Sequence, residues 1–100
     1  MMAIGACGLM NAVGNINPKP LSDLCEAVWR GDLMAARALH RQLYHLNEAV
    51  FFDINPIPMK AMMKMCGLLE VNEHRLPLLP ATPELETRLE SVLKDAGLLT

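Results

Sequence analysis

The chain has 100 residues, a length that suits one small domain. Hydrophobic residues make up 52% and aromatic residues only 4%, and frequent Leu, Ala and Met favour helix over sheet. The formal net charge is −2 with scattered Lys and Arg, which excludes the basic surface that nucleic acid or an anionic membrane requires.

The apolar N-terminal segment, residues 1–10, resembles neither a secretion signal nor a membrane span. No Lys or Arg precedes Lys19, so the basic region of a signal peptide is missing. Asn11 ends the apolar run well short of the roughly 18–20 residues that cross a bilayer. We therefore expect no membrane partner.

The residue types that bind metals are poorly spaced for that purpose. Cys7, Cys25 and Cys66 are odd in number and far apart, which predicts reduced, buried thiols in a cytoplasmic protein. His40 and His45 are five residues apart and would point to different sides of a helix. We therefore predict no metal site.

The first third of the chain predicts one strand and one helix. Residues 8–13 form a short apolar run before a turn at residues 14–15, typical of a buried strand. Pro18 and Pro20 open a helix that ends at Gly31. Because a lone buried strand leaves its backbone groups unpaired, we expect its neighbours to come from protein outside these residues.

Three more helices are predicted after residue 31. Asp32 caps a helix over about 33–52, which carries an apolar stripe. That stripe contains Leu33, Ala36, Leu39, Leu43, Leu46 and Val50. A short helix over about 58–66 has Met on nearly every side, which favours an adaptable core over a binding surface.

A loop over 67–81 and a well-signalled helix complete the chain. Thr82 is the expected N-cap and Pro83 the first helical residue. Lys94 is placed to pair with Glu90, one turn earlier, and Gly97 ends the helix.

The chain has four lysines, and none is well placed for Schiff-base chemistry, which needs a desolvated amine on a rigid element. Lys19 lies in a proline-flanked turn and Lys94 on an exposed helical face. Lys60 and Lys64 share one face of the short helix, where we expect solvent. Lys60 is the best of these weak candidates.

Asn55 is a second candidate, because it lies in the stiff connector of residues 53–58. Pro56 and Pro58 each fix one backbone angle, which would hold the Asn55 amide in place. The amide could bind a ligand, or it could cap the next helix or close a turn. The residues alone favour the second interpretation.

Several segments together resemble the dihydrodipicolinate synthase and N-acetylneuraminate lyase family of pyruvate Schiff-base aldolases. The connector and the residues around it, Phe-Phe-Asp-Ile-Asn-Pro-Ile-Pro-Met-Lys at 51–60, are similar to that family's Asn-Pro-Ile-Pro segment. His-Arg-Leu-Pro-Leu at 74–78, Gly-Ala-Cys-Gly-Leu-Met at 5–10 and Asp-Ala-Gly-Leu-Leu at 95–99 also match in register. The resemblance covers essentially the whole chain.

The resemblance implies an α/β fold, the C-terminal part of a (β/α)8 TIM barrel. Residues 1–31 would be the last strand and helix of the barrel, and residues 32–100 a three-helix C-terminal domain. The chain would then be a C-terminal fragment, itself mostly α-helical, whose partner is the remainder of the barrel. The family also implies a homo-oligomer, often a tetramer.

The same resemblance implies lyase chemistry in which a lysine holds pyruvate as a Schiff base and a second carbonyl compound, such as aspartate semialdehyde, condenses with it. That lysine belongs to an earlier strand, so no catalytic residue is expected in this chain. Met10 and Asn55 match positions near the substrate. No metal or organic cofactor takes part.

Two departures leave alternatives open. Asn11 and Val13 stand where the family commonly has Ser and Thr, which bears on the substrate. The N-acetylneuraminate lyase and 2-keto-3-deoxy sugar-acid aldolase branches remain alternatives. A third alternative, from a different class, is a free-standing helical module that binds partners through its Met-rich helix.

Overall fold

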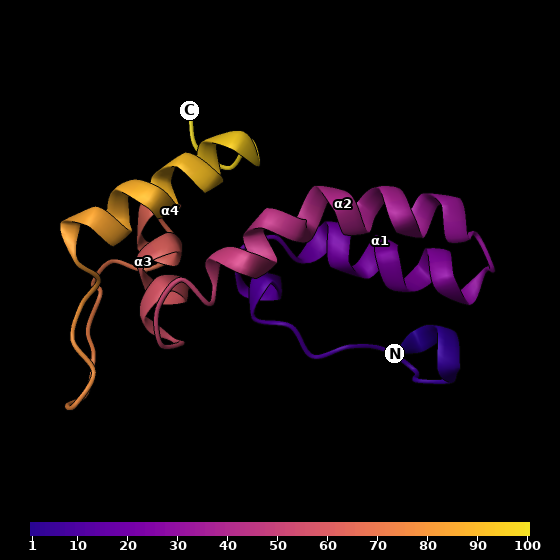
Figure 1. Cartoon of the computed structure of the whole chain (residues 1–100), viewed down its shortest axis with the longest axis horizontal. Helices are drawn as coiled ribbons and strands as arrows, with labels where there is room; N and C mark the ends of the chain where they lie inside the picture. The colour runs from indigo at the N-terminus through magenta and orange to yellow at the C-terminus, as the bar shows by residue number, and fades with distance from the viewer.

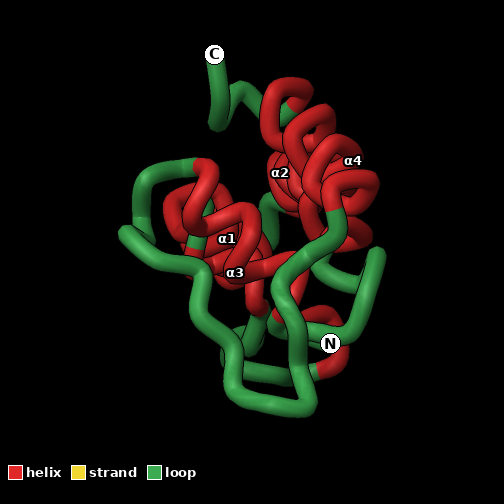
Figure 2. Tube along the Cα trace, turned by 90° about the vertical axis from the view of Figure 1, so that its left-hand side faces the viewer, coloured by secondary structure: helices red, strands yellow, loops and turns green.

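A computed structural model describes all 100 residues as four α-helices and two short 3-10 turns, with no strand (Figures 1 and 2). The elements are η1 (Met2–Ile4), η2 (Ala12–Asn15), α1 (Pro18–Trp29), α2 (Leu33–Ala49), α3 (Ile57–Met65) and α4 (Pro83–Asp95). Helices α1 and α2 form a hairpin, and α3 packs with α4 at the other end (Figure 1).

The predicted strand over residues 8–13 is not formed, so this prediction is wrong for the chain by itself. Asn11 has an extended backbone, with φ −146° and ψ 128°, but no neighbouring strand pairs with it. The Asn11 side chain instead accepts a hydrogen bond from the Val13 amide and starts η2. Val13 is buried, whereas Met10 is fully exposed. Without ladder partners, only the C-terminal end of the segment bonds locally, through the Val13 amide and the Asn11 and Ala12 carbonyls.

The helix boundaries follow the signals that the sequence carries. The Asp32 side chain accepts from the Ala35 amide at 3.0 Å, and Thr82 from the Leu85 amide at 3.2 Å, so both predicted N-caps are confirmed. Gly97 ends α4 with a left-handed φ of 71°, which a residue with a Cβ adopts at a cost. Lys94 and Glu90 pair at 2.6 Å, as predicted.

Helix α2 ends at Ala49, three residues before its predicted end, and its first residue is not buried. Leu33 is 48% exposed, so it does not belong to the core. The rest of the predicted stripe faces inward, with Leu43 and Leu46 fully buried. The C-terminal half of α2 is therefore the part that holds the four helices together.

One hydrophobic core of 14 buried residues runs from η2 through all four helices. The short helix α3 supplies Met59 and Met62 to it, while Met63 and Met65 are partly buried against it. The prediction that the Met-rich helix is core is confirmed. A flexible thioether fills irregular space between packed helices, which suits its place beneath α4.

The thiols are less buried than expected. Cys7 is exposed, and Cys25 and Cys66 are only partly buried, so the prediction of buried cysteines is wrong. All three are free thiols. No helix has the length and apolar character that crossing a membrane would require.

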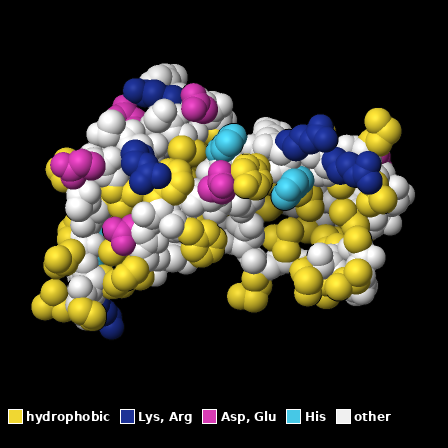
Figure 3. All heavy atoms as spheres, in the orientation of Figure 1, with side chains coloured by type: hydrophobic (Ala, Val, Ile, Leu, Met, Phe, Trp, Pro, Cys, Tyr) yellow, Lys and Arg dark blue, Asp and Glu magenta, His cyan; other side chains and the backbone are white.

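The molecule is elongated and leaves much apolar surface in solvent. A compact monomer of 11.1 kDa exposes about 5,700 Å², whereas this chain exposes 6793 Å². Its radius of gyration is 14.7 Å, against about 13 Å for a typical 100-residue domain. Apolar side chains gather beneath the α1–α2 hairpin and at the tip of the 67–81 loop (Figure 3).

Candidate functional site

Met10 lies in the extended segment between η1 and η2, with its whole side chain in solvent. It lines a small hollow of about 130 Å³ together with Asn47, Val50 and Phe51, among others. The hollow thus joins the segment before η2 to the end of α2. An exposed thioether beside an exposed ring offers an apolar wall to a small molecule or to neighbouring protein.

Asn55 lies in the connector before α3, and its side chain is exposed. It provides no cap, because Pro56 is the N-cap residue of α3 and no side chain bonds the first turn. The interpretation of Asn55 as a helix cap is therefore wrong. The turn closes through its backbone instead, where the Ile57 amide donates to the Ile54 carbonyl at 2.9 Å. The amide group of Asn55 is left available.

Two contacts fix the connector that carries Asn55. The Asp53 carboxylate accepts from the Ile54 amide at 2.6 Å. The Arg88 guanidinium lies 4.0 Å from the centre of the Phe52 ring, a cation–π contact that ties the residue just before the connector to α4. Sequence reasoning missed Arg88, because nothing in the sequence links position 88 with position 52.

Lys60 is not a free amine. Its Nζ donates to the backbone carbonyl of Glu73 and so joins α3 to the 67–81 loop. A lysine that forms a Schiff base must offer a neutral, unengaged nitrogen to the substrate. Lys60 therefore has a structural role, which is to link α3 to the 67–81 loop.

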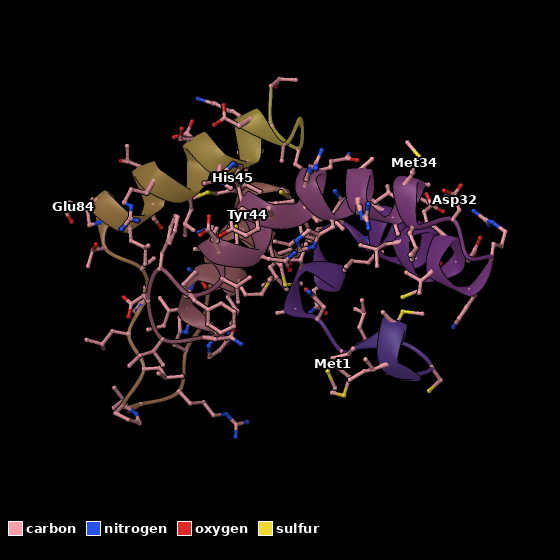
Figure 4. All side chains as sticks on the ribbon, turned by 45° about the vertical axis from the view of Figure 1, so that its right-hand side comes forward. Met1, Asp32, Met34, Tyr44, His45 and Glu84 are labelled. Atoms are coloured by element: carbon pink, nitrogen blue, oxygen red, sulfur yellow. The ribbon has the colours of Figure 1, made fainter.

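Helix α2 carries an aromatic cluster that motif reasoning did not assemble. The Tyr44 ring makes edge contacts with His40 and His45, with ring centres 6.2 and 5.5 Å apart; Tyr44 and His45 are labelled in Figure 4. A hydrogen bond with Glu48, together with the negative charge of Glu48, raises the pKa of Tyr44. Tyr44 is therefore protonated at neutral pH and cannot act as a base there.

The candidate residues occupy two separate places. Met10 borders the hollow at the end of α2, and Asn55 does not line that hollow. No group of three or more His, Cys, Asp or Glu side chains could hold a metal ion. The chain thus offers a ligand an apolar surface at Met10 and an amide at Asn55, but it assembles no set of reacting groups.

Solved structures share this backbone. The dihydrodipicolinate synthase of Thermotoga maritima superposes with a TM-score of 0.92 at 41% identity, over 98% of this chain and 33% of that one. The enzyme of Acinetobacter baumannii, solved with pyruvate and described as chloride-inhibited, gives 0.91 at 34% identity, with similar coverage of 98% and 33%. At 34% and 41% identity, the likeness indicates a shared family as well as a shared fold.

The chain belongs to the dihydrodipicolinate synthetase family, whose model matches residues 1–96. Among curated relatives, the 4-hydroxy-tetrahydrodipicolinate synthase of Thermus thermophilus is 48% identical over 99 residues, and that of Nitratidesulfovibrio vulgaris is 38% identical over the same length. The chain spans about a third of the length of these relatives, 33% and 34% respectively. The resemblance noted in the sequence is thereby confirmed at the level of the family.

Proposed function

We propose that the chain supplies the C-terminal third of a lyase that condenses pyruvate with an aldehyde such as aspartate semialdehyde. Pyruvate would be held as a Schiff base on a lysine outside these residues. Support comes from relatives named 4-hydroxy-tetrahydrodipicolinate synthase over 99% of the chain, and from a similar structure solved with pyruvate. The proposal includes a cytoplasmic location.

The observation that carries this proposal is the surplus of exposed apolar surface. Fourteen large hydrophobic side chains are exposed, and several belong to the segment before η2 and to the α1–α2 hairpin. A groove of about 490 Å³ between η1 and that hairpin is lined mostly by hydrophobic residues. Monomers seldom expose such surface unless a partner covers it. The remainder of a barrel is a partner of the right size, because the relatives are three times as long.

In this arrangement the extended residues before η2 become the last barrel strand and α1 the last barrel helix. Residues 1–31 would complete the barrel, and residues 32–100 would form the helical domain beyond it. The strand that is missing from the free chain would then form against its neighbours. A tetramer of the complete protein remains a prediction.

Met10 and Asn55 are the residues that we assign to substrate binding. Met10 would face the pocket from the end of the last strand, where barrel enzymes place their sites. Asn55 would contribute its unbonded amide from the connector. No catalytic role is assigned within the chain, since Lys60 is bonded to a carbonyl.

The alternative of a free-standing helical module is weakened by the burial of its proposed contact surface. Met59 and Met62 of α3 are 4% and 0% exposed, so these two Met side chains are not free to contact a partner. The aldolase branches for sugar acids share the pyruvate half of the reaction and differ only in the second substrate.

Complementation tests the proposal. The chain is co-expressed with the first two-thirds of the Thermus thermophilus relative, and condensation of pyruvate with aspartate semialdehyde is measured. We expect activity from the mixture and none from either part, and borohydride should trap pyruvate on the Thermus part only. A pyruvate adduct on Lys60 of this chain would contradict the assignment. A stable complex that lacks condensation activity with aspartate semialdehyde, yet cleaves a sugar acid, would favour the alternative branch.

A further inference from the structure

A short chain of side-chain hydrogen bonds crosses from the segment before η2 to α2. The Asn11 Nδ2 donates to the Asn47 Oδ1 at 2.7 Å, although the two residues are 36 positions apart. Asn47 in turn donates through Nδ2 to the Leu43 carbonyl at 3.0 Å. At the other end, the Asn11 Oδ1 accepts from the Val13 amide at 2.8 Å.

The two outer bonds fix the orientation of both amides. Because the Val13 N–H can only donate, it must face the Asn11 oxygen, which turns the Asn11 nitrogen toward Asn47. Because the Leu43 carbonyl can only accept, it must face the Asn47 nitrogen, which turns the Asn47 oxygen toward Asn11. The Asn11 nitrogen therefore donates to the Asn47 oxygen, and the flipped orientation of either amide is excluded.

The junction lies beside Met10. Asn47 and Met10 border the same hollow of about 130 Å³, and Asn11 is the next residue in the chain. The Asn47–Asn11 bond therefore restrains the backbone that carries Met10 against a helix whose C-terminal half is part of the core. Met10 has no other anchor of this kind, since its side chain is fully exposed.

We propose that Asn47 is a positioning residue, which acts through Asn11 to hold Met10 at the substrate pocket. That Asn47 holds Asn11 follows from the hydrogen bonds alone, whereas the placement of Met10 at a substrate pocket rests on the proposed function. No sequence motif points to Asn47.

The first experiment needs no activity and uses the 100-residue chain. Hydrogen exchange of the Val13 amide, followed by NMR, reports the Asn11 bond directly. In Asn47→Leu we expect exchange at Val13 to rise about two- to threefold, as suits the loss of one solvent-exposed hydrogen bond. The amide of Leu89 in α4 serves as the internal reference, and its exchange should not change.

Asn47→Asp is the matched variant for this measurement. Its carboxylate still accepts from Asn11 but cannot donate to the Leu43 carbonyl. Val13 exchange should therefore stay within error of the unchanged chain. Equal exchange at Val13 in Asn47→Leu and the unchanged chain would overturn the proposal, and so would an equal rise in Asn47→Leu and Asn47→Asp.

The second experiment measures kinetics in the complemented enzyme. Asn47→Leu should raise the KM for pyruvate about two- to threefold with kcat unchanged, whereas Gln42→Leu, a similar change at an exposed site on α2, should alter neither. A lower active fraction with an unchanged KM would show a merely structural role and overturn the positioning of Met10. If the unchanged chain does not complement, the proposed function fails, and Val13 exchange still decides whether Asn47 holds Asn11.

Discussion

At the scale of single residues, contacts between distant positions decide what each side chain can do. Lys60 had the most promising sequence context of the lysines, yet its amine bonds the Glu73 carbonyl. For Asn55, a cap on α3 or a closed turn was favoured over a ligand contact, yet no side chain caps α3 and the turn closes through backbone groups. Lys60 thus takes its partner from elsewhere in the chain, whereas the Asn55 amide stays unbonded.

Cys66 gives a prediction on pH. Partial burial raises the pKa of its thiol above the ordinary value of 9.0. The folded chain then binds a proton that the unfolded chain releases, so the free energy of unfolding should fall as the pH rises above about 9. Urea unfolding of the chain and of Cys66→Ala between pH 7 and 10 measures this difference. A constant difference across that range would contradict the prediction.

The contact between Arg88 and Phe52 gives a second prediction. Replacing Arg88 by Gln removes the cation over the ring and should lower the free energy of unfolding by about 0.5–1 kcal/mol. Arg88→Lys keeps the charge and should lose less. Arg41→Gln, on an exposed stretch of α2, is the control and should change stability little. Equal losses in Arg88→Gln and Arg41→Gln would argue against the contact.

At the scale of elements, the helices were predictable and the strand was not. Each helix carries its own start and stop, such as Asp32 before α2 and Gly97 after α4, and these act within a few residues. A strand depends on partners at a distance. The apolar run of residues 8–13 predicts that partners are needed, but it cannot make them appear in a chain that contains no other strand.

Site residues follow the same rule. Met10 and Asn55 are candidates proposed from motifs that lie within a few positions of each of them. Asn47 and Arg88 were missed because their roles depend on packing, which brings position 47 to position 11 and position 88 to position 52. A pattern with helical period indicates only which face of a helix is buried, and both residues lie outside that face.

Helix α2 is the element on which the fold depends most. Leu43 is fully buried at its centre, within the core that contains residues of η2, α1, α3 and α4. Leu43→Ala should lower the free energy of unfolding by about 2–5 kcal/mol, because the helices around it cannot close the cavity. Leu39→Ala, one turn earlier and only partly buried, is the matched control and should cost less. Urea unfolding followed by circular dichroism measures both.

At the scale of the whole molecule, the elongated shape and the exposed hydrophobic surface both bear on how the chain associates. The principal extents are 42 × 29 × 21 Å, and the two ends of the molecule are joined through the C-terminal half of α2 (Figure 1). Hydrophobic side chains that face solvent lie mainly at the N-terminal turn, the hairpin and the loop tip (Figure 3). A chain of this size with a single core gains little stability from apolar surface that stays in contact with water.

This surface leads to a prediction that a hydrophobic dye can test. The free chain should bind anilinonaphthalene sulfonate at the groove between η1 and the α1–α2 hairpin, because eight of the ten residues around that groove are hydrophobic. Adding the first two-thirds of the Thermus thermophilus relative should displace the dye as the apolar face becomes covered. Leu24→Glu places a charge in the groove and should weaken both dye binding and association, whereas Glu86→Gln, on the distant face of α4, should alter neither. Dye that stays bound while the two parts co-elute on gel filtration would mean that association uses another surface, and the barrel would then have to lie elsewhere.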